Sequence, residues 1–184
     1  MRKLIASAWI TLDGVFDATT MGQWWMPYDS PERQAHISEE LHASDALLLG
    51  RVTYEMLAPY WSQLKNNEMG IAGHLNKVAK WVVSTSLQKA DWNNSTIIGR
   101  NAMEEIQKLK QQPGRQILVE GSATLVRSLA EAGLVDEYRF LVQPIIMGSG
   151  RRFFKDDMSS GLTLIDSRTL ASGVLALRYA PAKK

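Results

Sequence analysis

Short runs of consecutive apolar residues recur along this 184-residue chain, and glycine or polar clusters bound most of them. Runs that are apolar at nearly every position are typical of strands buried on both faces of a parallel sheet. Their short lengths fit strands better than helices. They predict central strands at residues 3–10, 46–49, 81–84, 96–98 and 116–119.

Segments with apolar residues at helical spacing separate these strands. A helix is predicted to begin after Ser30, which offers an N-cap in front of a proline and a glutamate, and to end near Ala43. Two more helices are predicted over residues 102–110 and 122–132, and Gly133 is suited to end the second of them. Strands that alternate with helices indicate a mostly parallel sheet with helices on both faces.

The last third of the chain has a different pattern. Residues 138–146 are strand-like, and residues 162–170 and 174–179 flank the short loop Ala171-Ser172-Gly173. Two strands joined by so short a loop predict an antiparallel hairpin. No internal repeat or linker divides the sequence, so we expect a single α/β domain over residues 1–184 with an antiparallel edge.

The first ten residues share three features with a secretory signal: two cations, an apolar run and the triplet Ala6-Ser7-Ala8. Cleavage after Ala8 leaves too short a hydrophobic segment for recognition, so we interpret the run as a buried first strand. No other stretch approaches the roughly 20 apolar residues that span a bilayer. We therefore expect no contact with membranes.

Composition removes several classes of chemistry. The chain has no cysteine, which excludes disulfides, thiolate catalysis and cysteine-ligated metal centres and is typical of a cytoplasmic protein. Its 21 Lys and Arg residues and 19 Asp and Glu residues are spread along the sequence, so no nucleic-acid-binding stripe is predicted. His36, His42 and His74 share no zinc-ligand spacing, and we expect no metal site. Redox chemistry therefore requires a bound organic cofactor.

Two strands end in glycine and pass directly into a helix, at Gly50-Arg51 and at Gly121-Ser122. Glycine lets the backbone approach a ligand, and the first turn of a helix presents free N–H groups to an anion. If the strands are parallel, both junctions lie at the same edge of the sheet. Helix capping explains any single turn of this kind, but the repeated design favours a phosphate-binding edge.

Two arginines extend this edge. Arg51 follows the first glycine, and Arg100 follows the strand at residues 96–98. A charge-assisted hydrogen bond contributes about 1.5–3 kcal/mol, so the two arginines favour a ligand with an additional phosphate, NADPH over NADH. Ser84 and Thr85 add hydroxyl donors at the end of the third strand. The usual G-x-G-x-x-G dinucleotide fingerprint is missing.

Two features of the N-terminal segment have alternative interpretations. Asp13 precedes Gly14 after the first strand, so it is either a turn residue or a carboxylate that orients substrate or moves a proton. Trp24 and Trp25 lie in the following loop. They either cover a planar ligand or pack beneath the loop or at a subunit contact.

These motifs follow one another in an order typical of one superfamily. The segments that carry the match are residues 7–14, 49–55, 82–86, 119–122, 133–137, Pro144 and 148–150. Through them the sequence resembles the dihydrofolate reductase-like superfamily, most closely the reductase domain of riboflavin biosynthesis and its stand-alone relatives. The resemblance implies a three-layer α/β/α sandwich around a mixed sheet, an NADPH site and a homodimer.

The resemblance also implies roles for individual residues. Ala8 and Trp9 offer backbone to the nicotinamide carboxamide, and the 2′-phosphate lies near Arg100. The full set of implied cofactor-binding residues is Ala8, Trp9, Val15, Phe16, Gly50, Arg51, Thr53, Ser84, Thr85, Arg100, Gly121, Ser122, Ala123 and Thr124. Trp25, Gln143 and Pro144 are expected on the substrate side.

The sequence departs from its relatives at two positions. Dihydrofolate reductases carry a pterin-binding carboxylate where this chain has Arg33, so dihydrofolate reduction is not expected. The paired glycines of the pyrophosphate turn are Gly121-Ser122 here, and the cis or trans state of that bond is left open. The deaminase often fused to the riboflavin enzymes has no cysteine ligands in this chain.

The function expected from the sequence is an NADPH-dependent reductase, similar to 5-amino-6-(5-phosphoribosylamino)uracil reductase, that passes hydride to a small pterin- or pyrimidine-like substrate. Asp13 and Glu32 are the candidate catalytic residues, as proton sources or orienting groups. The alternative is a nucleotide-binding or dimeric scaffold of the same fold without turnover, which the missing carboxylate makes credible.

Overall fold

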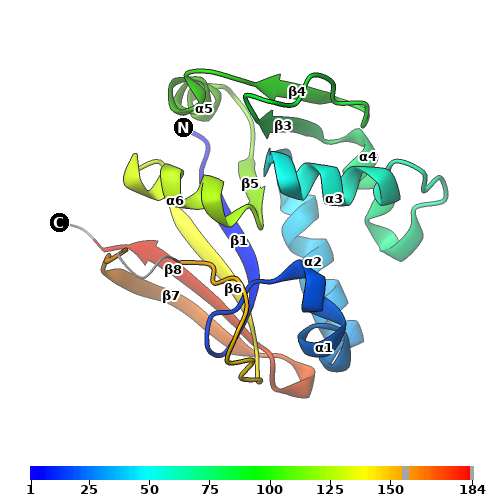
Figure 1. Ribbon diagram of the computed structural model, residues 1–184, viewed down its shortest axis with the longest axis vertical. Helices are drawn as coiled ribbons and strands as arrows, with labels where there is room; N and C mark the ends of the chain where they lie inside the picture. Colours follow the sequence, from blue (N-terminus) through cyan, green and yellow to red (C-terminus); the bar gives the residue numbers. More distant parts are fainter. Residues whose placement is uncertain (155–157, 183–184) are drawn as a thin grey trace.

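The computed structural model describes residues 1–154 and 158–182 (Figure 1). Eight strands form one sheet in the order β4-β3-β2-β5-β1-β6-β8-β7. The strands are β1 (Leu4–Thr11), β2 (Ser44–Gly50), β3 (Ala79–Val83), β4 (Ser95–Ile98), β5 (Gln116–Glu120), β6 (Glu137–Gln143), β7 (Leu162–Thr169) and β8 (Leu175–Pro181). The first six strands are mutually parallel, and β8 runs antiparallel to both β6 and β7.

Helices cover both faces of the sheet, which confirms the expected three-layer α/β/α sandwich with an antiparallel C-terminal hairpin (Figure 1). One core cluster joins the sheet to α5 and α6, and a second joins the opposite face to α2, α3 and α4. The α-helices are α1 (Met21–Trp24), α2 (Pro31–Ala43), α3 (Arg51–Trp61), α4 (Ala72–Lys77), α5 (Ala102–Gln111) and α6 (Ala123–Glu131). The short 3-10 helices are η1 (Ala18–Thr20), η2 (Met26–Tyr28), η3 (Glu68–Gly70) and η4 (Ala171–Gly173).

The central strand β1 shows why a run of apolar residues folds as a strand in this sheet. Leu4, Ala6 and Ala8 pack in the cluster beneath α5 and α6, while Ile5 packs beneath α2, α3 and α4. Because successive side chains of a strand point to opposite faces, a strand between two helix layers needs apolar residues at nearly every position. Complete burial of each large aliphatic side chain contributes about 1.5–3 kcal/mol. The N-terminal apolar run is therefore a buried strand, as expected.

Helix ends follow the predicted signals closely. The Ser30 side chain accepts a hydrogen bond from the Arg33 N–H and caps α2, and Pro31 occupies its first turn. Gly133 adopts a φ of +66° after α6, where the Leu134 N–H bonds the Leu129 carbonyl. The helices α1 and α4 were not predicted, because both are too short to show a periodic pattern.

The strand predicted over residues 138–146 ends earlier, at Gln143. Pro144 has no N–H to donate, and the chain turns there so that the Ile145 N–H bonds the Gln143 carbonyl. The region beyond this turn is linked to the loop after β1, because the Leu12 N–H bonds the Ile145 carbonyl. The turn therefore brings the segment after β6 beside the start of the site.

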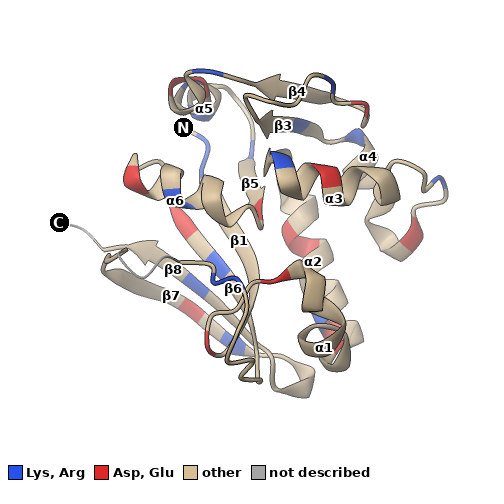
Figure 2. Cartoon of the chain, viewed as in Figure 1, with Lys and Arg blue, Asp and Glu red and all other residues tan. Residues whose placement is uncertain are grey.

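The two halves of the sheet differ in their surroundings. Acidic and basic residues both occur on β6 and β7, and β8 between them carries Arg178 (Figure 2), whereas β2 and β5 are mostly apolar. Every residue of β7 is exposed. Within the described part of the chain, no helix is both long and apolar enough to cross a membrane.

Candidate functional site

The two glycine turns meet at the carboxyl edge of the sheet. Strand β2 pairs with β5, so Gly50 and Gly121 leave neighbouring strands at the same edge. The Gly50 N–H donates to Ser122 Oγ over 2.9 Å, and that hydroxyl lies 3.0 Å from Thr53 Oγ1. The convergence predicted from the sequence is thus present, and a serine hydroxyl joins the two turns.

The second turn has an unusual backbone. Gly121 and Ser122 have φ values of +56° and +51°, and the bond between them is trans, as are the other peptide bonds of the described residues. A Cβ added to Gly121 would lie 3.0 Å from Phe16 Cζ, so the position is closed to larger residues. A non-glycine residue in this conformation costs on the order of 1–3 kcal/mol, and such residues cluster at functional sites. After it, Ala123 and Thr124 begin α6.

Two further strand ends extend the same edge. Strand β3 lies beside β2 and ends before Ser84, whose N–H bonds the Ile98 carbonyl at the end of β4. Ser84 Oγ accepts hydrogen bonds from the next turn, including 2.9 Å from the Leu87 N–H. Thr85 and Arg100 are exposed beyond these strands. The structure therefore places the implied 2′-phosphate residues along one line of strand ends with the glycine turns.

Arg51 is not a free cation in this structure. Its Nη1 lies 2.7 Å from Glu55 Oε2 one helical turn later, with both side chains roughly half exposed. An exposed pair of this kind is worth only about 0.3–0.5 kcal/mol. An incoming phosphate can therefore compete for Arg51 at little energetic cost.

The nicotinamide residues implied by the resemblance lie at the other side of Gly121. Ala8 is buried and Trp9 partly buried near the end of β1, and the Gly121 N–H bonds the Ser7 carbonyl over 2.8 Å. Phe16 packs edge-on against Phe153 at 5.4 Å and contacts Gly121. Val15, in contrast, is fully buried and forms a bridge to Arg152.

Asp13 joins two loops. Its carboxylate accepts hydrogen bonds from the Thr11 hydroxyl, from the Met147 N–H over 3.2 Å and from the Gly148 N–H over 2.8 Å. These hydrogen bonds, chiefly the one from Thr11, lower the pKa of Asp13 to about 2. The group is ionised at neutral pH, so it has no proton to donate. Its geometry fits the turn interpretation.

Glu32 also makes local contacts. Its carboxylate accepts a hydrogen bond from the Ala171 N–H over 2.8 Å and another from Arg168, so it joins the start of α2 to the β7–β8 hairpin. The Ala171 and Arg168 hydrogen bonds lower the pKa of Glu32. Like Asp13, Glu32 is an anion at neutral pH and lies on a structural contact.

Trp25 is buried in a stack of aromatic and cationic groups. The rings of Trp9 and Trp25 are parallel with centroids 3.8 Å apart, and the Arg33 guanidinium carbon lies 3.7 Å from the Trp25 centroid. Arg33 is 1% exposed and donates to the Trp25 carbonyl and to Asp29, both over 2.8 Å. Trp24 is buried as well. The packing interpretation of the tryptophan pair therefore fits the structure, and Arg33 holds this stack together.

The two remaining substrate-side residues lie at the end of β6. Gln143 is fully buried, and its Oε1 has no hydrogen-bond partner among the described residues. Pro144 is exposed, and its carbonyl lies 3.5 Å from the Tyr28 hydroxyl. An orphaned buried acceptor of this kind requires a donor from water or from a ligand.

Glu120 is a site residue that the sequence reasoning missed. It is the last residue of β5, directly before the Gly121 turn, and it lies opposite Ser7 in the β1–β5 register. It shares the α2 face of the sheet with Leu118, two residues earlier. Although part of the residue still reaches solvent, burial and, to a lesser extent, the charge on Glu40 together raise the pKa of its carboxyl to about 8.

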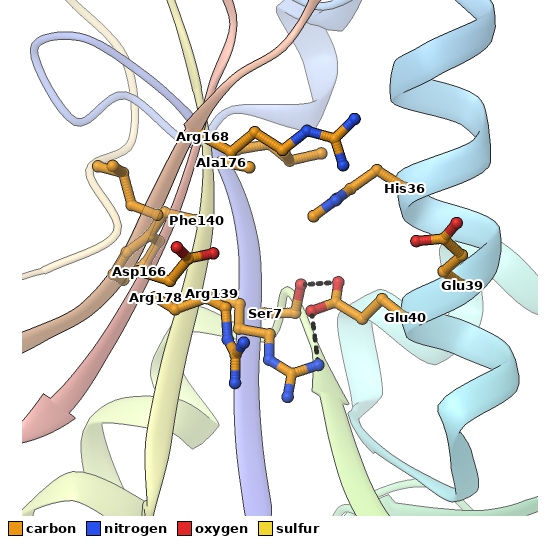
Figure 3. Close-up of a pocket in the computed structure, with 12 residues that line it drawn as sticks. Ser7, His36, Glu39, Glu40, Arg139, Phe140, Asp166, Arg168, Ala176 and Arg178 are labelled. Atoms are coloured by element: carbon orange, nitrogen blue, oxygen red, sulfur yellow. Dashed lines mark hydrogen bonds and ion pairs between the residues drawn. The ribbon is translucent and has the colours of Figure 1, made fainter.

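A cavity of about 190 Å³ lies on the α2 face (Figure 3); its lining includes Ser7, the residue opposite Glu120 in the β1–β5 register, but not Glu120 itself. Ser7, Glu40 and Arg139 line it from β1, α2 and β6. Ser7 Oγ donates to Glu40 Oε2 over 2.8 Å, and Arg139 Nη1 lies 3.5 Å from Glu40 Oε1. Its mouth carries His36, Arg168 and Asp166 from α2 and β7 (Figure 3). The signal that could have revealed this cluster is a polar residue within an otherwise apolar strand, at Ser7 and at Glu120.

The strand-end residues fit a phosphorylated dinucleotide. Gly50 packs against Ser122 and Gly121 against Phe16, which brings the two turns together, and both turns lead into helices of adequate length, α3 with 11 residues and α6 with 9. Arg51 and Arg100 supply positive charge at the same edge. Among residues 1–154 and 158–182, no group of three histidine, aspartate or glutamate side chains could hold a metal ion.

The chain is similar to known proteins both in sequence and in fold. The chain is 30% identical over 183 residues to the uncharacterised protein YyaP of Bacillus subtilis (strain 168), covering 97% of this chain and 94% of that protein. A pyrimidine reductase-like protein of Corynebacterium diphtheriae has a TM-score of 0.72 at 13% identity, covering 100% of this chain and 93% of that one. Dihydrofolate reductase of Enterococcus faecalis, solved with NADP(H), has a TM-score of 0.66 at 14% identity, with 98% and 97% covered.

These structural likenesses show that the fold is that of dihydrofolate reductase. The sequence match is more specific and extends over almost the entire chain, since residues 2–176 match the family described as the RibD C-terminal domain. The family supports a reductase-like role. The chain therefore belongs to the RibD C-terminal domain family.

Proposed function

We propose that this protein is an NADPH-dependent reductase of a small heterocyclic substrate of the pterin or pyrimidine type. The observation that carries the proposal is the junction of the Gly50 and Gly121 turns through Ser122 Oγ, with the Glu120 carboxyl one residue away. Reduction by NADPH needs a site that binds the phosphates of the hydride donor and an acid that protonates the reduced substrate. The two glycine turns would supply the first, and the neighbouring Glu120 carboxyl would supply the second.

In this proposal, different groups of residues bind different parts of NADPH. The backbone of the two turns and the first turns of α3 and α6 bind the diphosphate, and Arg51 and Arg100 select the 2′-phosphate. Ala8, Trp9 and Phe16 position the nicotinamide end beside Gly121. When bound, the cofactor supplies a hydride to an electrophilic carbon of the substrate.

Glu120 is the proton donor in this proposal. A carboxyl with a pKa of about 8 is mostly protonated at neutral pH, and Glu120 directly precedes the Gly121 turn, beside which we propose that the nicotinamide binds. Asp13 and Glu32 hold their negative charge in loop contacts, so we assign neither of them this step. Reduction of a C=N or C=O bond then proceeds by hydride addition at carbon and protonation at nitrogen or oxygen by Glu120.

One observation favours the scaffold alternative. Arg33 occupies the position of the pterin-binding carboxylate and is buried against Trp25, so part of the usual substrate contact is filled by protein. A protein that binds NADPH and reduces no compound fits this alternative. Homodimerisation and a cytoplasmic location stay predictions.

Titration of the purified protein with NADPH and NADH tests the proposal. We expect saturable quenching of tryptophan fluorescence with NADPH and a weaker response with NADH. NADPH oxidation is then followed at 340 nm with a panel of pterins, pyrimidines and their phosphorylated ribosides. The absence of saturable binding of either dinucleotide contradicts the reductase, and binding without turnover of any compound supports the scaffold. Turnover of dihydrofolate at ordinary enzymatic rates contradicts our expectation from Arg33.

A further inference from the structure

Two carboxyl groups approach each other across Ser7 on the α2 face of the sheet. Ser7 lies opposite Glu120 in the β1–β5 register, and its hydroxyl donates to Glu40 Oε2 over 2.8 Å. The side chain of Glu40 is 9% exposed, which is low for a charged residue. A cavity lined by Ser7 and Glu40 joins this place to solvent (Figure 3).

The Glu40 and Glu120 carboxyl groups differ in the hydrogen-bond donors and cations that contact them. Glu40 has the Ser7 hydroxyl and the Arg139 guanidinium, and both stabilise a carboxylate. Glu120 forms no ion pair and no side-chain hydrogen bond through its carboxyl among the described residues. When two nearby carboxyls compete for one negative charge, the group with donors ionises first and the other keeps its proton.

Resting on the proposed function, we propose that Glu40 is a positioning residue for reduction: held by Ser7 and Arg139, its carboxylate keeps the transferable proton on Glu120. Glu40 does not touch the substrate in this proposal. It acts through its charge, and Glu120 is the group that donates.

The pKa directions agree with this geometry. Burial raises the pKa of Glu40, and the Ser7 hydrogen bond and Arg139 charge oppose that rise. Burial and, second, the charge on Glu40 together raise the pKa of Glu120 to about 8, and no other group opposes the rise. Glu40 is therefore the first of the pair to ionise.

Other charged groups surround the pair and must be considered in any pH dependence. His36 lies one helical turn before Glu40, and Arg178 approaches Glu40 from β8. Glu137 on β6 accepts hydrogen bonds of 2.8 Å from both Arg139 and Arg178, so it neutralises much of their charge. The charge on His36 acts on Glu40, and a control variant must separate its effect on the Glu120 transition from that of Glu40.

The direct test needs no substrate. Protein labelled with carbon-13 at glutamate carboxyls is titrated by NMR without ligand, and the Glu120 signal is assigned by its loss in Glu120→Gln. We expect a Glu120 transition near pH 8 in the unmodified protein. In Glu40→Gln, which keeps the side-chain size and removes the charge, we expect this transition roughly one pH unit lower. An unchanged transition overturns the proposal.

Three further variants make the result specific. Glu40→Asp keeps the charge and should leave the transition within a few tenths of a pH unit of its original position. Glu39→Gln removes a charge from the adjacent, exposed position of α2 and should have no effect. His36→Gln removes the neighbouring imidazole and should also leave the Glu120 transition in place. If Glu40→Gln does not fold, Ser7→Ala replaces it: loss of the hydroxyl that stabilises the Glu40 carboxylate should change the Glu120 transition, and no change overturns the proposal.

Turnover gives a second readout once a substrate is found. The rate should fall above the pKa of Glu120, because only the protonated acid donates, and Glu40→Gln should move that basic limb to lower pH. A uniform loss of rate at all pH values with an unmoved limb indicates a purely structural role and contradicts the proposal. If no compound is reduced but the NMR transition shifts as expected, the carboxyl pair is established and the reductase function fails alone.

Discussion

The cofactor edge and the cavity side of this molecule are built in different ways. The cofactor edge consists of the ends of β5, β2, β3 and β4, where glycines and helix N-termini present backbone groups. The cavity side consists of β1, β6, β8 and β7 under α2, where charged side chains from distant segments meet (Figures 2 and 3). Backbone sites follow from local turn chemistry and tolerate side-chain change, whereas side-chain sites depend on each residue.

The largest effect should follow from Glu120→Gln, a change at the last residue of β5, where the cofactor edge meets the α2 face of the sheet. Removal of the proton donor should lower kcat by about 10²–10⁴-fold, because general acid catalysis typically contributes that much. Fluorescence titration should give an unchanged NADPH affinity, since the backbone turns remain intact. Glu104→Gln, on the first turn of α5, is the matched control and should retain full rate. Full activity of Glu120→Gln would falsify its role.

Gly121→Ala changes the cofactor edge alone. The added Cβ lies 3.0 Å from Phe16 Cζ at a φ of +56°, so both a close contact and backbone strain displace the turn. We expect the displaced turn to lower NADPH affinity by roughly 5- to 150-fold, which corresponds to a cost on the order of 1–3 kcal/mol. Gly133→Ala has a similar φ of +66° with nothing within 4 Å of its Cβ, so it imposes strain without the contact. It should lower the thermal stability and leave NADPH affinity unchanged, and equal binding losses in both variants would contradict our assignment of the turn.

Arg51→Ala tests whether Arg51, at the cofactor edge, binds the 2′-phosphate of NADPH. Loss of a charge-assisted hydrogen bond to the 2′-phosphate should weaken NADPH by roughly tenfold or more and NADH far less. The ion pair with Glu55 contributes little to stability, so folding should be unaffected. Arg115→Ala, at the opposite end of β5, serves as the control in the same titration. Equal losses for both dinucleotides refute the proposed 2′-phosphate contact.

The smallest effect concerns Asp13, which joins the loops beside both regions. Its pKa is about 2 in the folded protein, below the ordinary value of 3.8. A depressed folded-state pKa gives stability that is present above the unfolded value and is lost as pH falls toward 2. Asp13→Asn should therefore be slightly less stable at neutral pH and show a weaker loss of thermal stability between about pH 5 and pH 2.

Turnover by Asp13→Asn separates the two roles considered for this residue. Because an ionised carboxylate cannot donate a proton, the variant should keep its rate at neutral pH once it is folded. A loss of rate comparable to that of Glu120→Gln, at unchanged stability, would instead assign Asp13 to catalysis.

The sequence by itself determined the parts of this protein that depend on local chemistry. Continuous apolar runs identified the parallel strands, because strands between two helix layers are buried on both faces. The caps at Ser30 and Gly133 and the glycine turns at residues 50 and 121 were predictable for the same reason: their signals lie within a few neighbouring residues. Parallel strands then required the two turns to share one edge.

Only the tertiary structure decided which polar side chains meet. Ser7, Glu40 and Glu120 come from β1, α2 and β5, and sequence spacing carries no information about their approach. Likewise, Asp13 and Glu32 were chosen as carboxylates near motifs, but their partners in distant loops hold them as anions. A carboxyl group's protonation depends on its burial and its neighbours, and long-range contacts set both of these.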